Sequence, residues 1–136
     1  MSDRQTTLQE LKDRMAAFVR ERDWEQFHTP KNLSMSIAIE AAELMEHFQW
    51  LTVEASKNLP PEALTEIGEE LADIVIYSLS LANTLELDLA ETILAKMEKN
   101  IRKYPSDKVR GKSYKYTHYQ NQESGGGSRE SEGSES

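Results

Sequence analysis

Two apolar stretches of the sequence carry acidic residues at helical spacing. They are "IEAAELMEHFQW" and "LTEIGEELADIVIYSLSLANTL", which begin at Ile39 and Leu64. Residues three or four apart share one face of an α-helix, so each stretch is predicted to be a helix with an acidic stripe. The segment between them is short enough for an antiparallel hairpin, which would turn the two stripes toward each other. The stripes contain the pairs Glu40 with Glu43 and Glu70 with Asp73, and Glu66 lies one turn before Glu70.

Four segments in all show helical periodicity, and none shows the sustained alternation of apolar and polar residues that indicates a strand. Thr7 with Glu10 has the pattern of a capping box, and Asp88 with Glu91 gives a similar signal. The chain is therefore predicted to be all-α, a four-helix bundle. The predicted helices run from Thr7 to about Arg20 or Arg22, from Pro30 to about Leu51, from Pro61 to about Leu85, and from Asp88 to just before Pro105.

The chain of 136 residues fits one domain of ordinary size. That domain is predicted to span residues 1–119. Residues 120–136, "QNQESGGGSRESEGSES", are too polar to bury the apolar area that would offset their ordering entropy. This tail is expected to be disordered or to be a cloning remnant, and we assign it no function.

Charge is unevenly distributed along the chain. The net charge is −8, yet residues 96–115 hold eight Lys or Arg and only two acidic residues. An acidic body with one basic segment argues against general nucleic-acid binding and suits a small anionic ligand. The chain has no cysteine, which excludes disulfides and thiolate metal sites. It shows no signal peptide and no apolar run long enough to span a bilayer, so a soluble, cytoplasmic protein is expected.

A single E-x-x-E pair is most often a solvated helix face, but both acidic pairs here are flanked by apolar residues. Four like charges in a partly desolvated groove oppose folding unless a cation lies between them. Oxygen ligands without cysteine favour Mg²⁺ or Mn²⁺ over zinc. A di-iron site would need two Glu-x-x-His motifs, and only Glu25 and His28 have that spacing. His28, His47 and His118 are each expected to be structural or surface residues.

The two acidic pairs, separated by 26 residues, resemble the E-x-x-E and E-x-x-D signature of the MazG-like all-α nucleoside triphosphate pyrophosphohydrolases. The likeness extends over residues 7–117, where segments such as "RDWEQFHTPKNL", "ELADIVIY" and "KMEKNIRKYP" are similar to the dCTP pyrophosphatase branch. The resemblance implies Mg²⁺-dependent hydrolysis of (deoxy)nucleoside triphosphates to the monophosphate and pyrophosphate, a house-cleaning activity with a dCTP-like preference. It implies these metal ligands and catalytic residues: Glu40, Glu43, Glu70 and Asp73.

The chemistry of such a site agrees with this interpretation. A triphosphate carries several negative charges, and Mg²⁺ held by carboxylates neutralises the charge that develops during phosphoryl transfer. A carboxylate is then available to accept a proton from the attacking water. Spacing does not identify which carboxylate does so, and Glu43 is our preference.

The resemblance also implies contacts to the substrate. Vertebrate relatives place a histidine where this chain has Met15, a departure that bears on base preference. Taken without the resemblance, the two tryptophans would be assigned to the core or to an interface. The implied contacts are Trp24 and Trp50 for the base, Tyr77 near the sugar, and Lys96 and Asn100 for the phosphates or the base.

Residues 103–117, "KYPSDKVRGKSYKYT", are basic and interleaved with tyrosines. Alone they would suit a nucleic-acid arm, but their place after the fourth helix, together with the resemblance to the family, implies a segment folded over the active groove or a neighbouring subunit. The third helix is apolar on nearly all sides, which predicts self-association. The resemblance implies a homotetramer built as a dimer of dimers, with no membrane or nucleic-acid partner. The alternative function is a non-catalytic helical interaction module whose acidic groove binds a cation or a basic partner.

Overall fold

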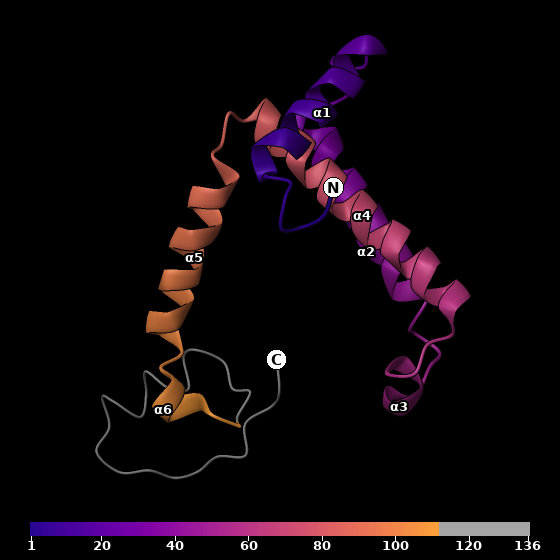
Figure 1. Cartoon of the computed structure of the whole chain (residues 1–136), viewed down its shortest axis with the longest axis vertical. Helices are drawn as coiled ribbons and strands as arrows, with labels where there is room; N and C mark the ends of the chain where they lie inside the picture. Colours follow the sequence, from indigo (N-terminus) through magenta and orange to yellow (C-terminus); the bar gives the residue numbers. More distant parts are fainter. Residues whose placement is uncertain (112–136) are drawn as a thin grey trace. The chain divides into compact units, whose positions relative to one another are not determined.

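The computed structural model describes residues 1–111, and these residues form helices without any strand. The all-α prediction is therefore confirmed (Figure 1). The predicted tail at 120–136 and the end of the basic segment, from residue 112 on, lie outside the described residues. The helices are α1 (Leu8–Glu21), α2 (Pro30–Glu46), α3 (Val53–Ser56), α4 (Pro61–Thr84), α5 (Leu89–Lys103) and α6 (Ser106–Val109).

The chain divides into two compact units. The first is Met1–Leu89, which contains α1 to α4, and the second begins at Ala90 and contains almost all of α5 together with α6. The predicted single domain over residues 1–119 stays a prediction.

Helix starts follow the capping signals of the sequence. The Glu10 backbone N–H donates to Thr7 Oγ1 at 3.1 Å, and the Thr7 N–H donates to Glu10 Oε2 at 2.6 Å, which completes a capping box. At the start of α2, the Asn32 N–H donates to Thr29 Oγ1 at 3.3 Å, and Pro30 is the first helical residue. Both signals are local, which explains why the sequence alone predicted them.

The predicted second helix was too long at its C-terminal end. The structure ends α2 at Glu46, where the N–H groups of His47 and Phe48 donate to carbonyls three residues back, as in the tighter last turn of a helix. The chain then starts the single-turn helix α3, because the Ala55 N–H donates to Thr52 Oγ1 at 3.1 Å. The sequence analysis missed both α3 and α6.

Helices α1 and α4 both end in a Schellman motif that lacks glycine. After α1, Asp23 has φ 53° and Trp24 donates its N–H to Val19 O at 3.0 Å. After α4, Glu86 has φ 54° and Leu87 donates its N–H to Ala82 O at 2.9 Å. These two motifs set the direction in which the chain leaves each helix.

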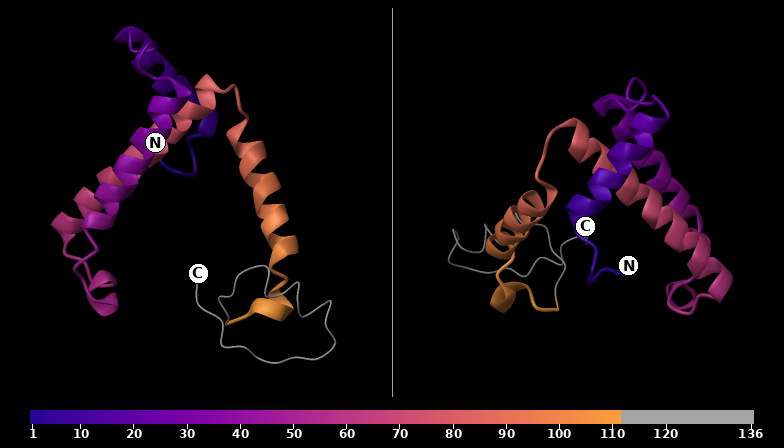
Figure 2. Two further views of the ribbon diagram at one scale, coloured as in Figure 1. Left: turned by 180° about the vertical axis from the view of Figure 1, so that it is seen from behind. Right: turned by 45° about the horizontal axis from the view of Figure 1, so that its top comes forward.

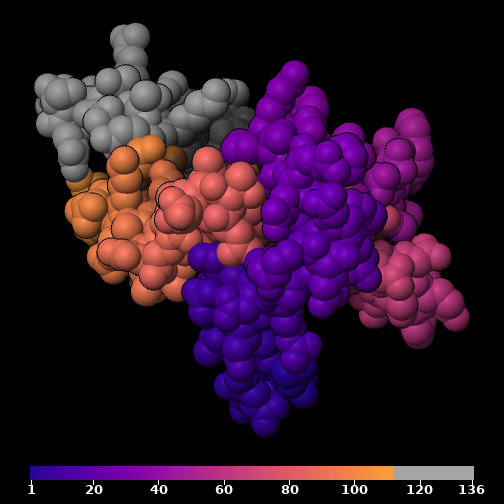
Figure 3. All heavy atoms as spheres, turned by 90° about the horizontal axis from the view of Figure 1, so that it is seen from above, coloured from indigo at the N-terminus to yellow at the C-terminus, as the bar shows by residue number. Residues whose placement is uncertain are grey.

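Helix α4 is the element against which both α1 and α2 pack. Helix α2 runs alongside it, as both views of Figure 2 show, and α1 packs against its C-terminal part. Lys12 on α1 donates from Nζ to Leu87 O at 2.7 Å, and Asn83 donates from Nδ2 to Lys12 O at 2.9 Å. In Figure 3 the indigo N-terminal residues lie against the salmon end of α4. The buried apolar residues among those described are Val19, Leu33, Leu79 and Ala82.

Among the described residues, no helix has both the length and the apolar character that crossing a bilayer requires.

We expect Glu86→Gly to raise the free energy of unfolding by about 1 kcal/mol, because a side chain in the left-handed region is strained and glycine is not. The matched control is Glu69→Gly in the middle of α4, which should lower that free energy by about the same amount. Urea unfolding followed by circular dichroism measures both. Two substitutions that shift stability in the same direction would contradict the prediction.

Candidate functional site

Three of the four predicted metal ligands meet between α2 and α4. Glu40 and Glu43 on α2 and Glu70 on α4 each offer one carboxylate oxygen, and these oxygens lie within 4.8 Å of one another. Asp73 follows Glu70 by one turn and lies outside this group, yet close enough for its charge to act on Glu40 and Glu70. The packing of α2 on α4 thus brings three carboxylates together, with the fourth beside them.

Two oxygens of this cluster are buried without a partner. Glu40 Oε2 and Glu70 Oε2 are shielded from solvent, and neither accepts a hydrogen bond within the described part of the chain. A buried carboxylate oxygen with no donor is costly, because the lost hydration is not replaced. A cation between the two helices would supply the missing contact, so the residues present fit a metal ion that prefers oxygen ligands.

Burial is the largest cause of the raised pKa of Glu40, which reaches about 7. The carboxylates of Glu43 and Glu70 raise this pKa further because they can accept a hydrogen bond from the protonated form of Glu40, and the negative charges of Glu43 and Asp73 act in the same direction. Burial also raises the pKa of Glu70, and the charges of Glu43 and Asp73 act in the same direction, while its hydrogen bond with Glu40 opposes them. Without a cation, the cluster therefore keeps a proton that a lone glutamate would lose.

His47 lies at the edge of this cluster. Its Nδ1 is 4.0 Å from Glu66 Oε2 and its Nε2 is 4.0 Å from Glu70 Oε1. The sequence analysis predicted a structural or surface role for His47, which lies four residues after Glu43. In the structure the ring stands between two carboxylates of α4, those of Glu66 and Glu70.

The aromatic residues form a second group in the first unit. Trp24 stacks on His28 with ring centroids 6.2 Å apart and an interplanar angle of 19°, and His28 faces Tyr77 at 6.4 Å. The Schellman motif after α1 places Trp24 in this group. Trp50, by contrast, lies in the turn after α2 with 88% of its surface exposed, and it makes no ring contact with residues 1–111.

Lys96 and Asn100 lie one turn apart on α5 and are both exposed. They belong to the second unit, whereas the carboxylates belong to the first. Their predicted contacts to the substrate stay predictions.

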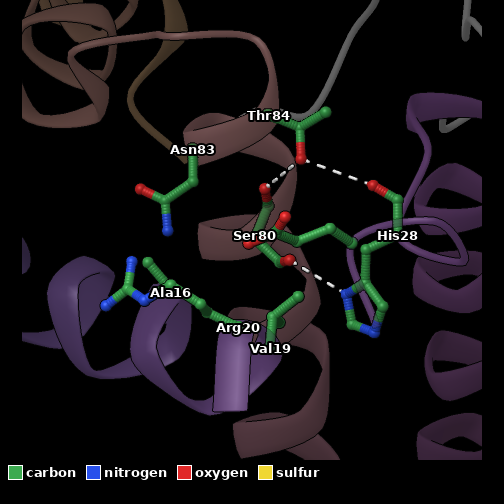
Figure 4. A pocket seen from close by; sticks show the side chains of 8 residues that line it. Ala16, Val19, Arg20, His28, Ser80, Asn83 and Thr84 are labelled. Carbon is green, nitrogen blue, oxygen red and sulfur yellow. Dashed lines mark hydrogen bonds between the residues drawn. The ribbon is translucent and has the colours of Figure 1, made fainter. Parts of the chain in front are cut away.

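A cavity of about 270 Å³ lies between α1, the loop before α2 and the end of α4. Figure 4 shows His28 reaching it from the loop and Ser80 and Thr84 from α4, with His28 Nδ1 3.1 Å from Ser80 Oγ. The sequence analysis missed Ser80. The available signal was its position three residues after Tyr77, which continues the stripe of Glu70 and Asp73 along α4. The cavity is lined by Ala16, Val19, Arg20, Glu25, His28, Ser80, Asn83 and Thr84.

Comparison with known proteins places this arrangement in a family. Residues 35–118 match the MazG-like family. The chain belongs to the MazG-like family, which confirms the resemblance seen in the sequence.

Individual relatives agree with that assignment. The chain is 41% identical over 113 residues to dCTP pyrophosphatase 1 of Homo sapiens and 42% identical to that of Bos taurus, and each match covers 82% of this chain. The matches cover 66% of the human protein and 67% of the bovine one, so the chain spans about two thirds of these relatives. A crystal structure of a pyrophosphatase from Archaeoglobus fulgidus is also similar, with 40% identity and a TM-score of 0.69, covering 77% of this chain and 98% of that one.

The raised pKa of Glu40 predicts a pH dependence of stability in metal-free protein. A carboxyl whose pKa rises on folding contributes stability that is fully present below its unfolded pKa, near 4.5, and is lost as pH rises through the folded value of about 7. The free energy of unfolding should therefore fall across this window, and Glu40→Gln should reduce the fall.

Urea unfolding in the presence of EDTA, at pH values from 4.5 to 8, measures this dependence. Glu46→Gln is the matched control, because Glu46 is an exposed carboxylate on the same helix, outside the cluster. Equal pH slopes for Glu40→Gln and Glu46→Gln would contradict the prediction.

Proposed function

We propose that the protein hydrolyses deoxynucleoside triphosphates to the monophosphate and pyrophosphate, with a preference for dCTP-like substrates. The observation that carries the proposal is the meeting of Glu40, Glu43 and Glu70 around two partnerless carboxylate oxygens. The relatives named dCTP pyrophosphatase 1 and the pyrophosphatase from Archaeoglobus fulgidus support it. A house-cleaning role and a cytoplasmic location are parts of the same proposal.

The cofactor in this proposal is Mg²⁺, or Mn²⁺ in its place. Glu40, Glu43 and Glu70 would hold the ion, with Asp73 completing the acidic set. When bound, the ion neutralises charge on the phosphates and lowers the pKa of a water molecule. The carboxylates must be ionised to hold it, so binding competes with the proton that burial keeps on Glu40.

Side chains around the cation would accept a proton from the attacking water and would hold the substrate. Carboxylates that are not occupied by the cation can accept the proton that water loses, a role that we assign to Glu43. Trp24 and Trp50 would contact the base and Tyr77 the sugar, because flat rings offer stacking surfaces for a nucleoside. Lys96 and Asn100 would contact the phosphates or the base.

Activity depends on the carboxylate cluster in this proposal. We expect wild-type protein with Mg²⁺ to release pyrophosphate from a panel of canonical and modified deoxynucleoside triphosphates, and most readily from dCTP and its analogues. Glu43→Gln and Asp73→Asn should each lower kcat/KM by roughly 100-fold or more, because each removes a charged group from the site.

Glu46→Gln and Glu69→Gln are the controls, since both change exposed carboxylates beside the cluster and should keep wild-type rates. Pyrophosphate release is followed with and without EDTA. The absence of metal-dependent release from every nucleotide would refute the enzyme assignment and favour a non-catalytic helical module.

Self-association forms a further part of the proposal. Apolar side chains remain exposed along α2 and α4 of the first unit, and burying them against another copy would lower the free energy. We propose a homotetramer built as a dimer of dimers. The exposed residues on these two helices are Met35, Ile39, Met45, Leu64, Leu71, Val75 and Ile76.

Light scattering coupled to size-exclusion chromatography tests the assembly. A tetramer of the 15.5 kDa chain is expected, and Leu71→Asp should convert it to smaller species because a buried, unpaired charge is costly. Leu71 is 53% exposed in the single chain, so the substitution should leave its helix content unchanged. A monodisperse monomer of the wild-type protein would refute this part of the proposal.

A further inference from the structure

Ser80 is a buried polar residue in the most apolar part of α4. Only 4% of its surface is exposed, and its neighbours Leu79 and Ala82 belong to the apolar core. A buried hydroxyl needs a hydrogen-bond partner, and Ser80 Oγ has one in His28 Nδ1 at 3.1 Å. The contact joins α4 to the loop between α1 and α2, 52 residues away in the sequence.

The Thr84 hydroxyl also contacts the loop that contains His28. Thr84 donates from Oγ1 to Ser80 O at 2.9 Å and lies 3.5 Å from His28 O, so it bridges α4 and the backbone of the loop (Figure 4). The His28 N–H in turn donates to Trp24 O at 3.1 Å. The backbone of His28 is thus held from both sides, and the hydrogen bond to Ser80 is what fixes the rotation of its ring.

The orientation of this ring matters because His28 stands between two other aromatic residues. Trp24 stacks on it at 6.2 Å and Tyr77 faces it at 6.4 Å. We call Trp24, His28 and Tyr77 the aromatic group. Trp24 also meets Phe18 edge to face with ring centroids 5.7 Å apart, so a rotation of the imidazole would remove one of the two ring contacts that hold Trp24. Ser80 therefore acts on the whole aromatic group through one ring.

The aromatic group lies on the same face of α4 as the carboxylates. Glu70, Asp73, Tyr77 and Ser80 follow at intervals of three and four residues, and the ten residues from Glu70 to Ser80 rise by about 15 Å. A nucleotide whose phosphates lie at the carboxylates would extend along this face toward the aromatic group. Its base end would then meet the surface that Ser80 holds in place.

We propose that Ser80 is a positioning residue for base recognition: its hydroxyl fixes the ring of His28 and thereby the aromatic group against which the nucleotide base packs. This inference rests on the proposed function and extends it to a residue that never touches the phosphates. It predicts that the loss of the hydroxyl weakens binding of the base and leaves the chemistry at the carboxylates intact.

Steady-state kinetics with dCTP and Mg²⁺ test the inference in full-length protein. Ser80→Ala should raise KM about three- to tenfold, the effect of one hydrogen bond, and change kcat by less than about twofold. Inorganic tripolyphosphate, which has no base, serves as a competitive inhibitor. Its inhibition constant should be the same for Ser80→Ala and the wild type, because its binding does not involve the aromatic group.

Two further variants separate positioning from general damage. Ser80→Thr keeps the hydroxyl and adds a methyl group that the adjacent cavity can receive, so it should restore the wild-type KM. Ser78→Ala is the matched control, because the Ser78 hydroxyl only donates within its own helix, to Ile74 O at 2.7 Å. In a Trp50→Phe background, Ser80→Ala should also shift the fluorescence of Trp24, which Ser78→Ala should not do.

Distinct results would overturn the inference and the proposed function. An active wild type with an unchanged KM in Ser80→Ala, or an equal weakening of tripolyphosphate inhibition, would refute the positioning role and leave the enzyme assignment standing. A wild type that hydrolyses no nucleotide would refute the proposed function and this inference with it. An unchanged Trp24 fluorescence in Ser80→Ala would refute the coupling between Ser80 and the aromatic group.

Discussion

Repulsion among carboxylates is the constraint around which the first unit is organised. Apolar packing of α2 on α4 brings Glu40, Glu43 and Glu70 within 4.8 Å of one another, and two of their oxygens lose water without gaining a donor. Folding thus places negative charges where they oppose it, and burial raises the pKa of Glu40 to about 7. Such an arrangement is stable only if protons or cations neutralise part of the charge. In the proposed enzyme, a bound metal ion would neutralise this negative charge.

Helix α4 links the parts of the site in the first unit. Its middle holds Glu70 beside the α2 carboxylates with Asp73 one turn further on, and its C-terminal part holds Ser80 and Thr84 against α1 and the loop. Because Glu70, Asp73, Tyr77 and Ser80 belong to one continuous helix, the spacing between their backbone positions is fixed. The cluster and the aromatic group therefore form one face, although they differ in chemistry and in the helices they contact.

Local signals and the meeting of the two acidic stripes across a short hairpin were predictable from the sequence, whereas individual tertiary contacts were not. The capping box at Thr7 and the spacing of Glu40 and Glu43 depend on residues three or four positions apart, which any helix brings together. The early end of α2 depends on a competing start at Thr52, and the contact between Ser80 and His28 joins residues 52 positions apart. A serine within an apolar stretch of sequence carries no signal that identifies its hydrogen-bond partner. Asp73 lies near the carboxylate cluster but is not one of its three members, and this also depends on the detailed packing of α2 on α4.

Because α4 is one continuous helix, it fixes the distance and the direction between the groups along its length. An α-helix fixes both the rise and the rotation between any two of its residues, so the gap between a phosphate end and a base end is set by counting residues and cannot stretch. One residue inserted between Asp73 and Tyr77 would turn everything beyond it by a little over a quarter of a revolution and carry Ser80 to another side of the helix. Side chains on the other faces of α4 can be exchanged without altering this spacing, whereas a single inserted or deleted residue between the two groups changes both their distance and their relative direction.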